Sequence, residues 1–362
     1  MGTRTVIPFG PQHPVLPEPI HLDLVLEDEK VVEAVPQLGF IHRGLEKLVE
    51  KRDFQQFIYI AERICGICSF GHSYGYAQGI EGLMGIEVPP RAEYLRAIFN
   101  ELSRVHSHLL WLGLLADAFG YENLFQQCWR LRETVLDMFE RTTGGRVILS
   151  ACCVGGMSVD VEDGVLAGIC TELETLESDY RRVCKAFLGD GSVNNRLKGI
   201  GLLSKEDAIA FSTVGPFARA SGVDYDTRTL GFGAYGDLAA FEPVTSDEGD
   251  GYARVDVRIR EVIQSIQIVR ELVSKMPAGE IAVKVKGAPA EGSRFVTRME
   301  QPRGCAVYLM KGNGTKFLER FRVRTPTSQN IAGLVHIMAG CDLADVPLNV
   351  LTIDPCISCT ER

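Results

Sequence analysis

Two Cys-x-x-Cys pairs lie near opposite ends of this 362-residue chain. Cys65 and Cys68 form the first pair, and Cys356 and Cys359 form the second, after which the sequence continues for three more residues. Thiolates are soft ligands, and four of them can enclose a soft metal ion. A single pair could also be a redox dithiol, or half of a zinc or cluster site. Two pairs together favour metal binding over disulfide exchange.

The distance between the pairs bears on what the metal does. A structural zinc knuckle normally keeps its pairs close in sequence, because the metal stabilises a small fold. Here almost the whole chain separates them, and a domain of this size buries a core of its own without a metal. The spacing favours a functional metal over structural zinc, and both interpretations stay open at this point.

Seven further cysteines are scattered through apolar surroundings, which brings the total to eleven. An odd number of cysteines in a large chain indicates reduced thiols rather than a disulfide framework. We interpret these seven as small buried hydrophobic residues.

The composition narrows the class of protein. With 46% hydrophobic and 23% charged residues, the chain is typical of a globular protein. A net charge of -9 argues against a nucleic-acid partner, which would need a basic surface. No apolar run approaches the roughly 20 residues that span a bilayer, and the first residues lack the apolar core of a signal peptide. We therefore expect a cytoplasmic protein; if it works at a membrane, other subunits must hold it there.

The elements that must position the cysteines are mainly helical. Alternating apolar residues over 20–35 predict a β-hairpin, preceded by a proline-rich irregular loop. Apolar residues at helical spacing predict four long helices, and residues 189–250 should be ordered around short elements. The four predicted helices cover residues 91–118, 124–142, 161–188 and 252–275.

The C-terminal part returns to β structure. Residues 305–310 and 317–323 flank a Lys-Gly-Asn-Gly turn and predict a hairpin, and a last helix is expected over 330–339. The resulting fold class is mainly α, or α+β, with a central bundle of long helices and β-hairpins at its N- and C-terminal parts. We find no linker that divides the chain, so residues 1–362 are expected to form one domain.

The cysteine motifs resemble those of a known family. Arg63-x-Cys65-Gly66-x-Cys68, followed by His72, resembles the N-terminal metal motif of nickel–iron hydrogenase large subunits. Asp354-Pro355-Cys356-x-x-Cys359 resembles their C-terminal motif. The segments 42–46, 302–304 and 326–327 extend the likeness, which covers essentially the whole chain.

Two other segments resemble a relative of that family. Residues 10–14, Gly-Pro-Gln-His-Pro, and residues 215–226 are similar to the large catalytic-arm subunit of respiratory complex I. A chain with both sets of features looks like the large subunit of a group 4, energy-converting hydrogenase of the Ech-type or CO-induced kind.

The resemblance implies a Ni–Fe centre. The four cysteines would hold nickel, and Cys68 and Cys359 would also bridge to an iron that carries CO and cyanide. H2 would be split heterolytically, with Cys356 as the first proton acceptor.

Residues around the cysteines take roles by the same resemblance. Arg303 and Thr327 match positions that donate hydrogen bonds to cyanide, and Pro302 and Pro326 line the same pocket. Taken alone, Arg303 would be a surface ion pair and Thr327 a turn hydroxyl. His72 and Arg63 are expected beside the cysteines, although a lone histidine is more often a satisfied core residue.

Glu18 is expected to relay protons from Cys356. It lies between two prolines in a rigid loop, and by resemblance this loop abuts the active site. An exposed loop carboxylate is the ordinary alternative.

Glu46 would be a ligand of a magnesium or similar divalent ion near the site. Many family members end in a histidine that helps to bind this ion, but this sequence has Arg362 there. A guanidinium has no lone pair for a metal. We predict that Arg362 replaces the ion and pairs with Glu46.

The function implied is reversible H2 cleavage and proton reduction by a catalytic hydrogenase subunit. Electrons would be exchanged with ferredoxin through a small iron–sulfur subunit, and the reaction would be coupled to ion translocation by membrane subunits. The complex would sit on the cytoplasmic side of the membrane. One alternative is a complex I-like, quinone-reducing subunit, which has the same fold but lacks the four cysteines. Another is a non-catalytic subunit with a structural metal.

Overall fold

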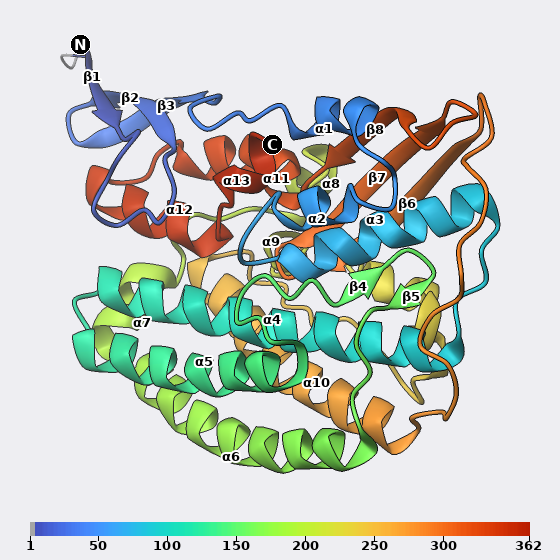
Figure 1. The fold of residues 1–362 in the computed structure, drawn as a ribbon. Helices are drawn as coiled ribbons and strands as arrows, with labels where there is room; N and C mark the ends of the chain where they lie inside the picture. Colours follow the sequence, from blue (N-terminus) through green and yellow to red (C-terminus); the bar gives the residue numbers. More distant parts are fainter. Residues whose placement is uncertain (1–3) are drawn as a thin grey trace.

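Four long helices lie side by side and form the lower half of the molecule in Figure 1. In the computed structural model, which describes residues 4–362, α4 contacts both α5 and α10, and α6 contacts the same two helices. The predicted bundle is therefore confirmed. Its helices are α4 (Pro90–Ala118), α5 (Glu122–Thr143), α6 (Asp163–Leu188) and α10 (Gly251–Ser274).

The bundle is built around α4. Pro90 starts this helix at a position where its missing N–H is not needed. Helices α5 and α6 each bury one apolar stripe, as the spacing of their leucines and valines predicts. Helix α4 is buried along nearly its whole length, including four of its charged residues, because other elements cover it.

Two three-stranded antiparallel sheets lie above the bundle (Figure 1). The N-terminal sheet has the order β1-β2-β3 and contains the expected hairpin. Strand β2 alternates buried leucines with half-buried, mostly polar residues, as one covered face requires. The sequence did not predict β1. These strands are β1 (Arg4–Phe9), β2 (His21–Glu27) and β3 (Lys30–Gln37).

The C-terminal sheet has the order β6-β7-β8. Its β7–β8 hairpin was predicted, but β6 was missed because its first half is exposed on both faces and gives no apolar alternation. Two short strands pair elsewhere. The strands are β6 (Arg294–Gln301), β7 (Gly304–Gly312), β8 (Leu318–Arg324), β4 (Cys152–Cys153) and β5 (Gly156–Met157).

The other helices are shorter and connect the bundle to the sheets. The helix predicted over 330–339 is α11 (Pro326–Met338), which starts four residues earlier with Pro326 in its first turn. Residues 189–250 are ordered around short elements, as expected. The remaining helices are α1 (Leu45–Leu48), α2 (Ile58–Glu62), α3 (Ser69–Met84), α7 (Gly191–Leu197), α8 (Lys205–Ala210), α9 (Pro216–Arg219), α12 (Val346–Ile353) and α13 (Ile357–Thr360).

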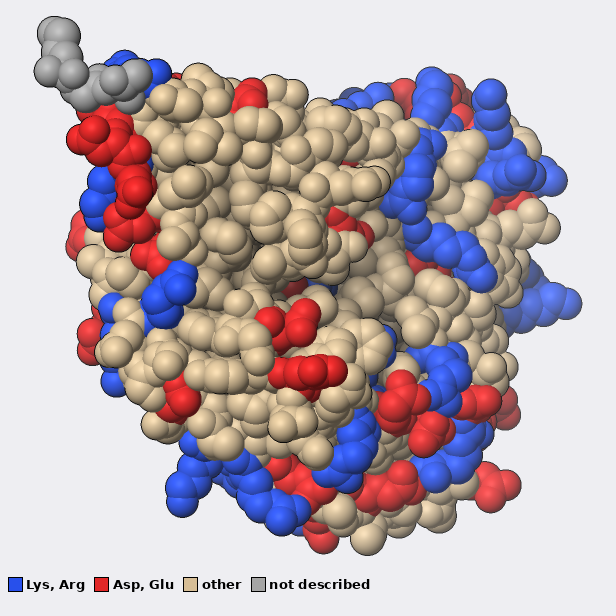
Figure 2. Space-filling view, turned by 90° about the vertical axis from the view of Figure 1, so that its left-hand side faces the viewer, with Lys and Arg blue, Asp and Glu red and all other residues tan. Residues whose placement is uncertain are grey.

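Charge is unevenly distributed over the surface. Seen from the left of Figure 1, the upper half of the molecule is mostly uncharged, with Asp and Glu along one margin and Lys and Arg along the other (Figure 2). Among residues 4–362, no helix combines the length and the apolar character needed to cross a membrane.

Helix α3 packs closely on the C-terminal sheet because glycines form its contact face. A Cβ on Gly75 would lie 2.4 Å from the Tyr308 ring, and one on Gly79 would lie 2.3 Å from the end of Met310. Because glycine is a poor helix former, the same glycines explain why the sequence did not predict this helix. The close packing fixes α3, which follows the first cysteine pair directly.

This packing predicts that Gly75→Ala lowers the free energy of unfolding by about 1–3 kcal/mol, because the added methyl group overpacks a buried contact. The matched control is Gly168→Ala in α6, where a Cβ meets no atom within 4 Å. The control should instead gain up to about 1 kcal/mol from helix propensity. Urea unfolding of both variants measures the difference. Equal stabilities would show that the α3 contact is not tight.

Candidate metal centre

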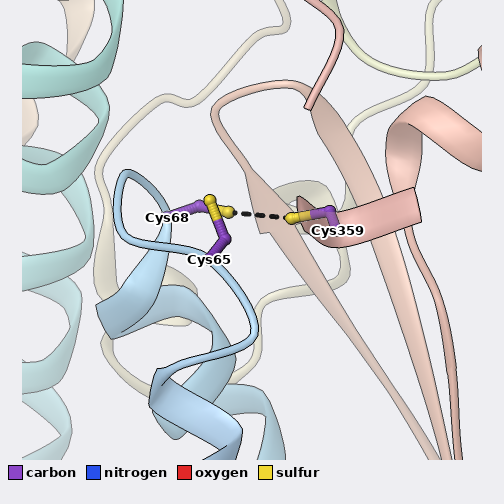
Figure 3. A group of neighbouring side chains, drawn as sticks. All are labelled: Cys65, Cys68 and Cys359. Carbon is purple, nitrogen blue, oxygen red and sulfur yellow. Dashed lines mark hydrogen bonds between the residues drawn. The ribbon is translucent and has the colours of Figure 1, made fainter. Parts of the chain in front are cut away.

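The four cysteines of the two pairs meet in one buried site. The Sγ atoms of Cys65 and Cys356 lie 3.3 Å apart, and so do those of Cys68 and Cys359. Figure 3 shows Cys65 and Cys68 on the loop before α3, facing Cys359 on α13. The sulfurs of these three residues all lie within 4.8 Å of one another. None of the four is more than 2% exposed, so the predicted convergence is confirmed.

Backbone N–H groups shape each pair locally. The N–H of Ile67 points at the Cys65 sulfur at 3.3 Å, and the N–H of Cys359 points at the Cys356 sulfur at 3.4 Å. In both motifs the intervening residues therefore curl the chain around the first sulfur. Such donors stabilise thiolates over thiols.

A sharp turn aims the second pair at the first. Helix α12 ends at Asp354, which adopts a left-handed conformation with φ of 57°. Side chains from the bundle hold the end of this helix: the Trp111 indole donates to the Leu351 carbonyl at 2.7 Å, and Arg258 donates to the Thr352 carbonyl at 2.8 Å. These donors satisfy carbonyls that a helix end leaves free, and Arg258 also suits its negative end.

The electrostatics of the four sulfurs favour a bound cation. Hydrogen bonds from neighbouring thiols, that of Cys356 first, hold the pKa of Cys68 well below its usual range. Burial raises the pKa of Cys359 well above it. Several thiolates in contact repel one another, so they cannot all ionise in a dry pocket unless a cation neutralises them. The donor set, four buried sulfurs, fits a soft metal.

His72 lies where it was expected, beside a cysteine. Its Nε2 atom is 3.2 Å from the Cys359 sulfur, and its Nδ1 atom is 3.0 Å from the Tyr308 hydroxyl. The ring is fully buried. A second partner on the other ring nitrogen fixes the ring orientation, as around many metal sites.

Arg303 forms a buried ion pair rather than a surface one. It lies in the two-residue turn between β6 and β7, directly after the buried Pro302. Its Nε donates to the Asp354 carbonyl at 2.8 Å and its Nη2 to the Asp354 carboxylate at 2.7 Å. The other carboxylate oxygen of Asp354 has no partner among the described residues.

Thr327 also contacts the second pair. Its hydroxyl oxygen accepts a hydrogen bond from the N–H of Cys356 at 3.0 Å. Pro326 starts α11 and places this hydroxyl in the first turn of that helix. Thr327 is 2% exposed, so its hydroxyl is shielded from solvent.

A cavity of about 390 Å³ opens onto two of the cysteines. Glu18, Cys65, Cys356, Arg303 and Asp354 supply its polar and sulfur groups. Its other wall is apolar and contains Leu110, Trp111, Leu114 and Trp129.

The half-buried Glu18 carboxylate caps the start of α13. It accepts hydrogen bonds from the N–H groups of Ile357 and Ser358 and from the Ser358 hydroxyl. An exposed loop carboxylate is therefore not what the structure shows. The loop holds Glu18 between the cavity and the second cysteine pair.

The side chain of Arg63 does not reach the sulfurs, so its expected place beside them is wrong. It is 54% exposed and donates back to the Tyr59 carbonyl at 2.9 Å. Its position at the end of α2 turns the side chain outward, while its backbone carries on into the cysteine loop.

Arg43 connects the two cysteine loops, a role that the sequence analysis did not predict. Its guanidinium donates to the carbonyls of Arg63 and Ile64 at 2.9 and 2.7 Å, and to the carbonyl of Ser358 at 2.9 Å. One side chain thus ties both cysteine loops together. The sequence feature that could have identified this role is the place of Arg43 in the 42–46 segment, which resembles the hydrogenase family.

The predicted pairing of Arg362 with Glu46 is confirmed at 3.1 Å. The Glu46 carboxylate also accepts from the N–H of Val323 at 2.9 Å. Glu361, which the sequence did not single out, accepts from the N–H groups of Gly39 and Ile41, both at 2.6 Å. These contacts fix the last residues beside the start of α1.

A buried network of ion pairs supports the site from below. Arg219 pairs with Glu261 of α10 at 2.7 Å and with Glu300 of β6 at 2.8 Å. Arg104 of α4 donates to the Glu300 carbonyl at 2.9 Å. All four side chains are fully buried. The network connects two bundle helices to the strand that ends in the Arg303 turn.

Two histidines of α4 belong to this packing and not to the metal site. His108 lies 3.0 Å from Glu261, and burial lowers its pKa to about 4. Burial also lowers the pKa of His106 to about 3. Both rings are therefore neutral near pH 7, as a packing role requires.

Comparison with known proteins places this geometry in a family. Residues 119–292 and 284–362 match the family described as the respiratory-chain NADH dehydrogenase 49 Kd subunit, and residues 43–118 match the nickel-dependent hydrogenase family. The chain is 38% identical to the carbon monoxide-induced hydrogenase of Rhodospirillum rubrum over 100% of both chains. It is 36% identical to the membrane-bound hydrogenase subunit alpha of Pyrococcus furiosus, over 98% of this chain and 87% of that protein.

A solved structure agrees with the sequence matches. A chain in the membrane-bound sulfane sulfur reductase, an archaeal respiratory membrane complex, superposes with a TM-score of 0.94 at 29% identity, covering 99% of this chain and 98% of that one. The chain therefore belongs to the family that unites the large subunits of nickel-dependent hydrogenases with the 49 Kd subunit of complex I.

Proposed function

We propose that the chain is the catalytic subunit of a nickel–iron hydrogenase that interconverts H2 with protons and electrons. The observation that carries the proposal is the meeting of four buried cysteine sulfurs from the two ends of the chain. A Ni–Fe centre with CO and cyanide on its iron would supply the binding and heterolytic splitting of H2. Cys65, Cys68, Cys356 and Cys359 would hold it.

The residues around the sulfurs would orient and neutralise the centre. His72 holds the Cys359 sulfur through Nε2. Arg303 and Thr327 would donate hydrogen bonds to cyanide, because a buried acceptor without a donor is costly. Arg303 lines the cavity beside Cys65 and Cys356, which suits this role.

Protons would leave through Cys356 and Glu18, which line the same cavity. The Cys356 thiolate would take the first proton, and the Glu18 carboxylate would pass it on. Glu18 is rigidly placed by backbone N–H donors of the segment that follows Cys356. A relay requires such fixed placement within hydrogen-bond reach, directly or through one water.

Electrons would leave through a partner. The sequence has no further cysteine cluster suited to an iron–sulfur centre. We propose a small iron–sulfur subunit as the immediate partner, ferredoxin as the more distant one, and membrane subunits that translocate ions. The relative named as a membrane-bound hydrogenase subunit supports a place at the membrane. We propose that this place is on the cytoplasmic side.

A complex I-like role in quinone reduction, without Ni–Fe, is the second candidate. The match of residues 119–362 to the 49 Kd subunit favours it. The four converging cysteines speak against it, since such a role needs no thiolate ligands. A structural zinc site would be the third outcome, and metal content separates all three.

The purified complex should contain nickel and iron in this chain, and its infrared spectrum should show bands of iron-bound CO and cyanide, which absorb where protein does not. Cys65→Ser should remove nickel and H2 evolution, because a hydroxyl is a harder and poorer ligand. Cys170→Ser, on the half-buried α6 cysteine, should keep both. Zinc without nickel, or no metal at all, would refute the proposal.

Glu18→Gln should keep nickel, iron and the infrared bands but slow H2 evolution by about 100-fold, the usual scale for a lost proton-transfer group. Glu33→Gln, an exposed carboxylate on β3, is the matched control and should be as active as the natural chain. Activity assays and metal analysis on both variants test this. Near-normal H2 evolution by Glu18→Gln would exclude the relay.

Arg362 would stand in for the divalent ion of other family members by pairing with Glu46. The natural chain should then hold no stoichiometric magnesium, whereas Arg362→His should acquire a chelator-sensitive divalent ion. Arg362→Lys, the charge-retaining control, should not. The pair is partly exposed, so Arg362→Ala should cost at most about 1 kcal/mol of stability. One equivalent of magnesium in the natural chain would contradict the proposal that Arg362 replaces the ion.

A further inference from the structure

The outer face of the C-terminal sheet is strongly basic, although the whole chain carries a net charge of -9. Between residues 294 and 324 the sequence has eight Lys and Arg residues and two Glu residues. Six of these cations occupy alternate positions on the three strands, opposite the buried face that packs on α3. We call them the basic face: Arg294, Arg298, Lys311, Arg320, Arg322 and Arg324.

The strand register places like charges directly opposite one another. Lys311 of β7 pairs with Arg294 of β6 on one side and with Arg320 of β8 on the other. Like charges at opposed positions destabilise a sheet. The arrangement therefore calls for compensating anions.

The chain supplies only part of that compensation. Lys311 pairs with Glu319, and Arg322 lies 3.5 Å from Glu46. The other four arginines of the basic face are exposed and form no ion pair within residues 4–362. An excess of unpaired guanidinium groups remains on one face of the sheet.

Apolar side chains occupy the middle of the basic face. Val296 is 52% exposed and pairs with the half-buried Leu309, and Val307 lies between Arg298 and Arg324. An apolar centre with a charged rim, rich in arginine, is the usual make-up of a protein–protein interface.

We infer that the basic face docks an acidic segment of another subunit of the complex. The face spans about 10 Å across its three strands and about 13 Å along them. That matches a single helix, whose diameter is about 10–12 Å, or a short extended segment. Arginine forks bind carboxylates through two parallel hydrogen bonds, which sets the orientation of such a segment.

The same observations disfavour a membrane as the occupant. Surfaces that insert into lipid headgroups project Trp, Phe and Leu side chains between their cations. Here the central residues are two valines and a half-buried leucine, which lie low between longer arginines. The inference does not depend on the metal content of the cysteine site.

Carbodiimide cross-linking of the intact, membrane-purified complex tests the docking directly. This reagent joins a lysine amine to a carboxylate that it touches, without a spacer. Arg298→Lys and Arg324→Lys keep the charge and introduce amines beside the natural Lys311. Both introduced amines should couple to Asp or Glu residues within one short segment of one other subunit, whereas the Lys311 amine can also couple to Glu319 of its own chain. Arg181→Lys on α6 is the control and should give no such product.

Charge reversal gives the second arm. Arg298→Glu combined with Arg324→Glu should lower the retention of the chain in the complex at least ten-fold during a salt wash, whereas Arg181→Glu combined with Arg182→Glu should leave it unchanged. Three results would overturn the inference: cross-links between two copies of this chain, no cross-link to another subunit, or loss of binding to phosphatidylglycerol vesicles in the reversal variant without any subunit cross-link. The charge-conserving lysine variants keep the test valid if the reversal variant fails to fold.

Discussion

Four sulfur atoms in contact inside a dry pocket set the constraint on which the rest of this structure depends. Two of the sulfur pairs are 3.3 Å apart, and every sulfur is buried. Thiolates at such distances repel one another, so the fold must hold the two ends of the chain together before a cation can make the cluster favourable. The protein does this mainly with main-chain atoms: carbonyls and N–H groups of the two cysteine loops bond to Arg43, Glu18 and Thr327, and a carbonyl at the end of α12 bonds to Trp111.

A second layer of charge makes that convergence rigid. Arg219, Glu261, Glu300 and Arg104 are fully buried, and each is paired. Removing one partner from such a network leaves an uncompensated buried charge and costs about 3–5 kcal/mol. The network therefore fixes α4, α10 and β6 relative to one another. The Arg303 turn at the end of β6 inherits this rigidity, and so does the cavity that it lines.

Local patterns predicted the bundle, two hairpins and the convergence of the cysteines, because helical spacing, strand alternation and paired ligands leave direct marks in a sequence. These patterns did not predict the elements whose structure depends on tertiary contacts. Helix α3 was not predicted because it contains glycines, which allow the close contact with Tyr308. Strand β6 was not predicted because arginines interrupt the alternation of apolar and polar residues. Arg63 stands two residues before Cys65 but its side chain turns outward, while Arg43, twenty residues earlier, reaches both loops. Distance along the chain does not reveal which of two arginines faces inward.

The choice of acceptors for Arg43 affects how this site can diverge. All three of its hydrogen bonds end on carbonyls, which every amino acid provides. The side chains at Arg63, Ile64 and Ser358 can therefore be exchanged over evolutionary time without breaking the connection. The two loops can therefore tolerate substitutions, whereas the guanidinium of Arg43 cannot be replaced. Relatives with unlike residues around their cysteines can thus retain the same spacing between the two halves of the site.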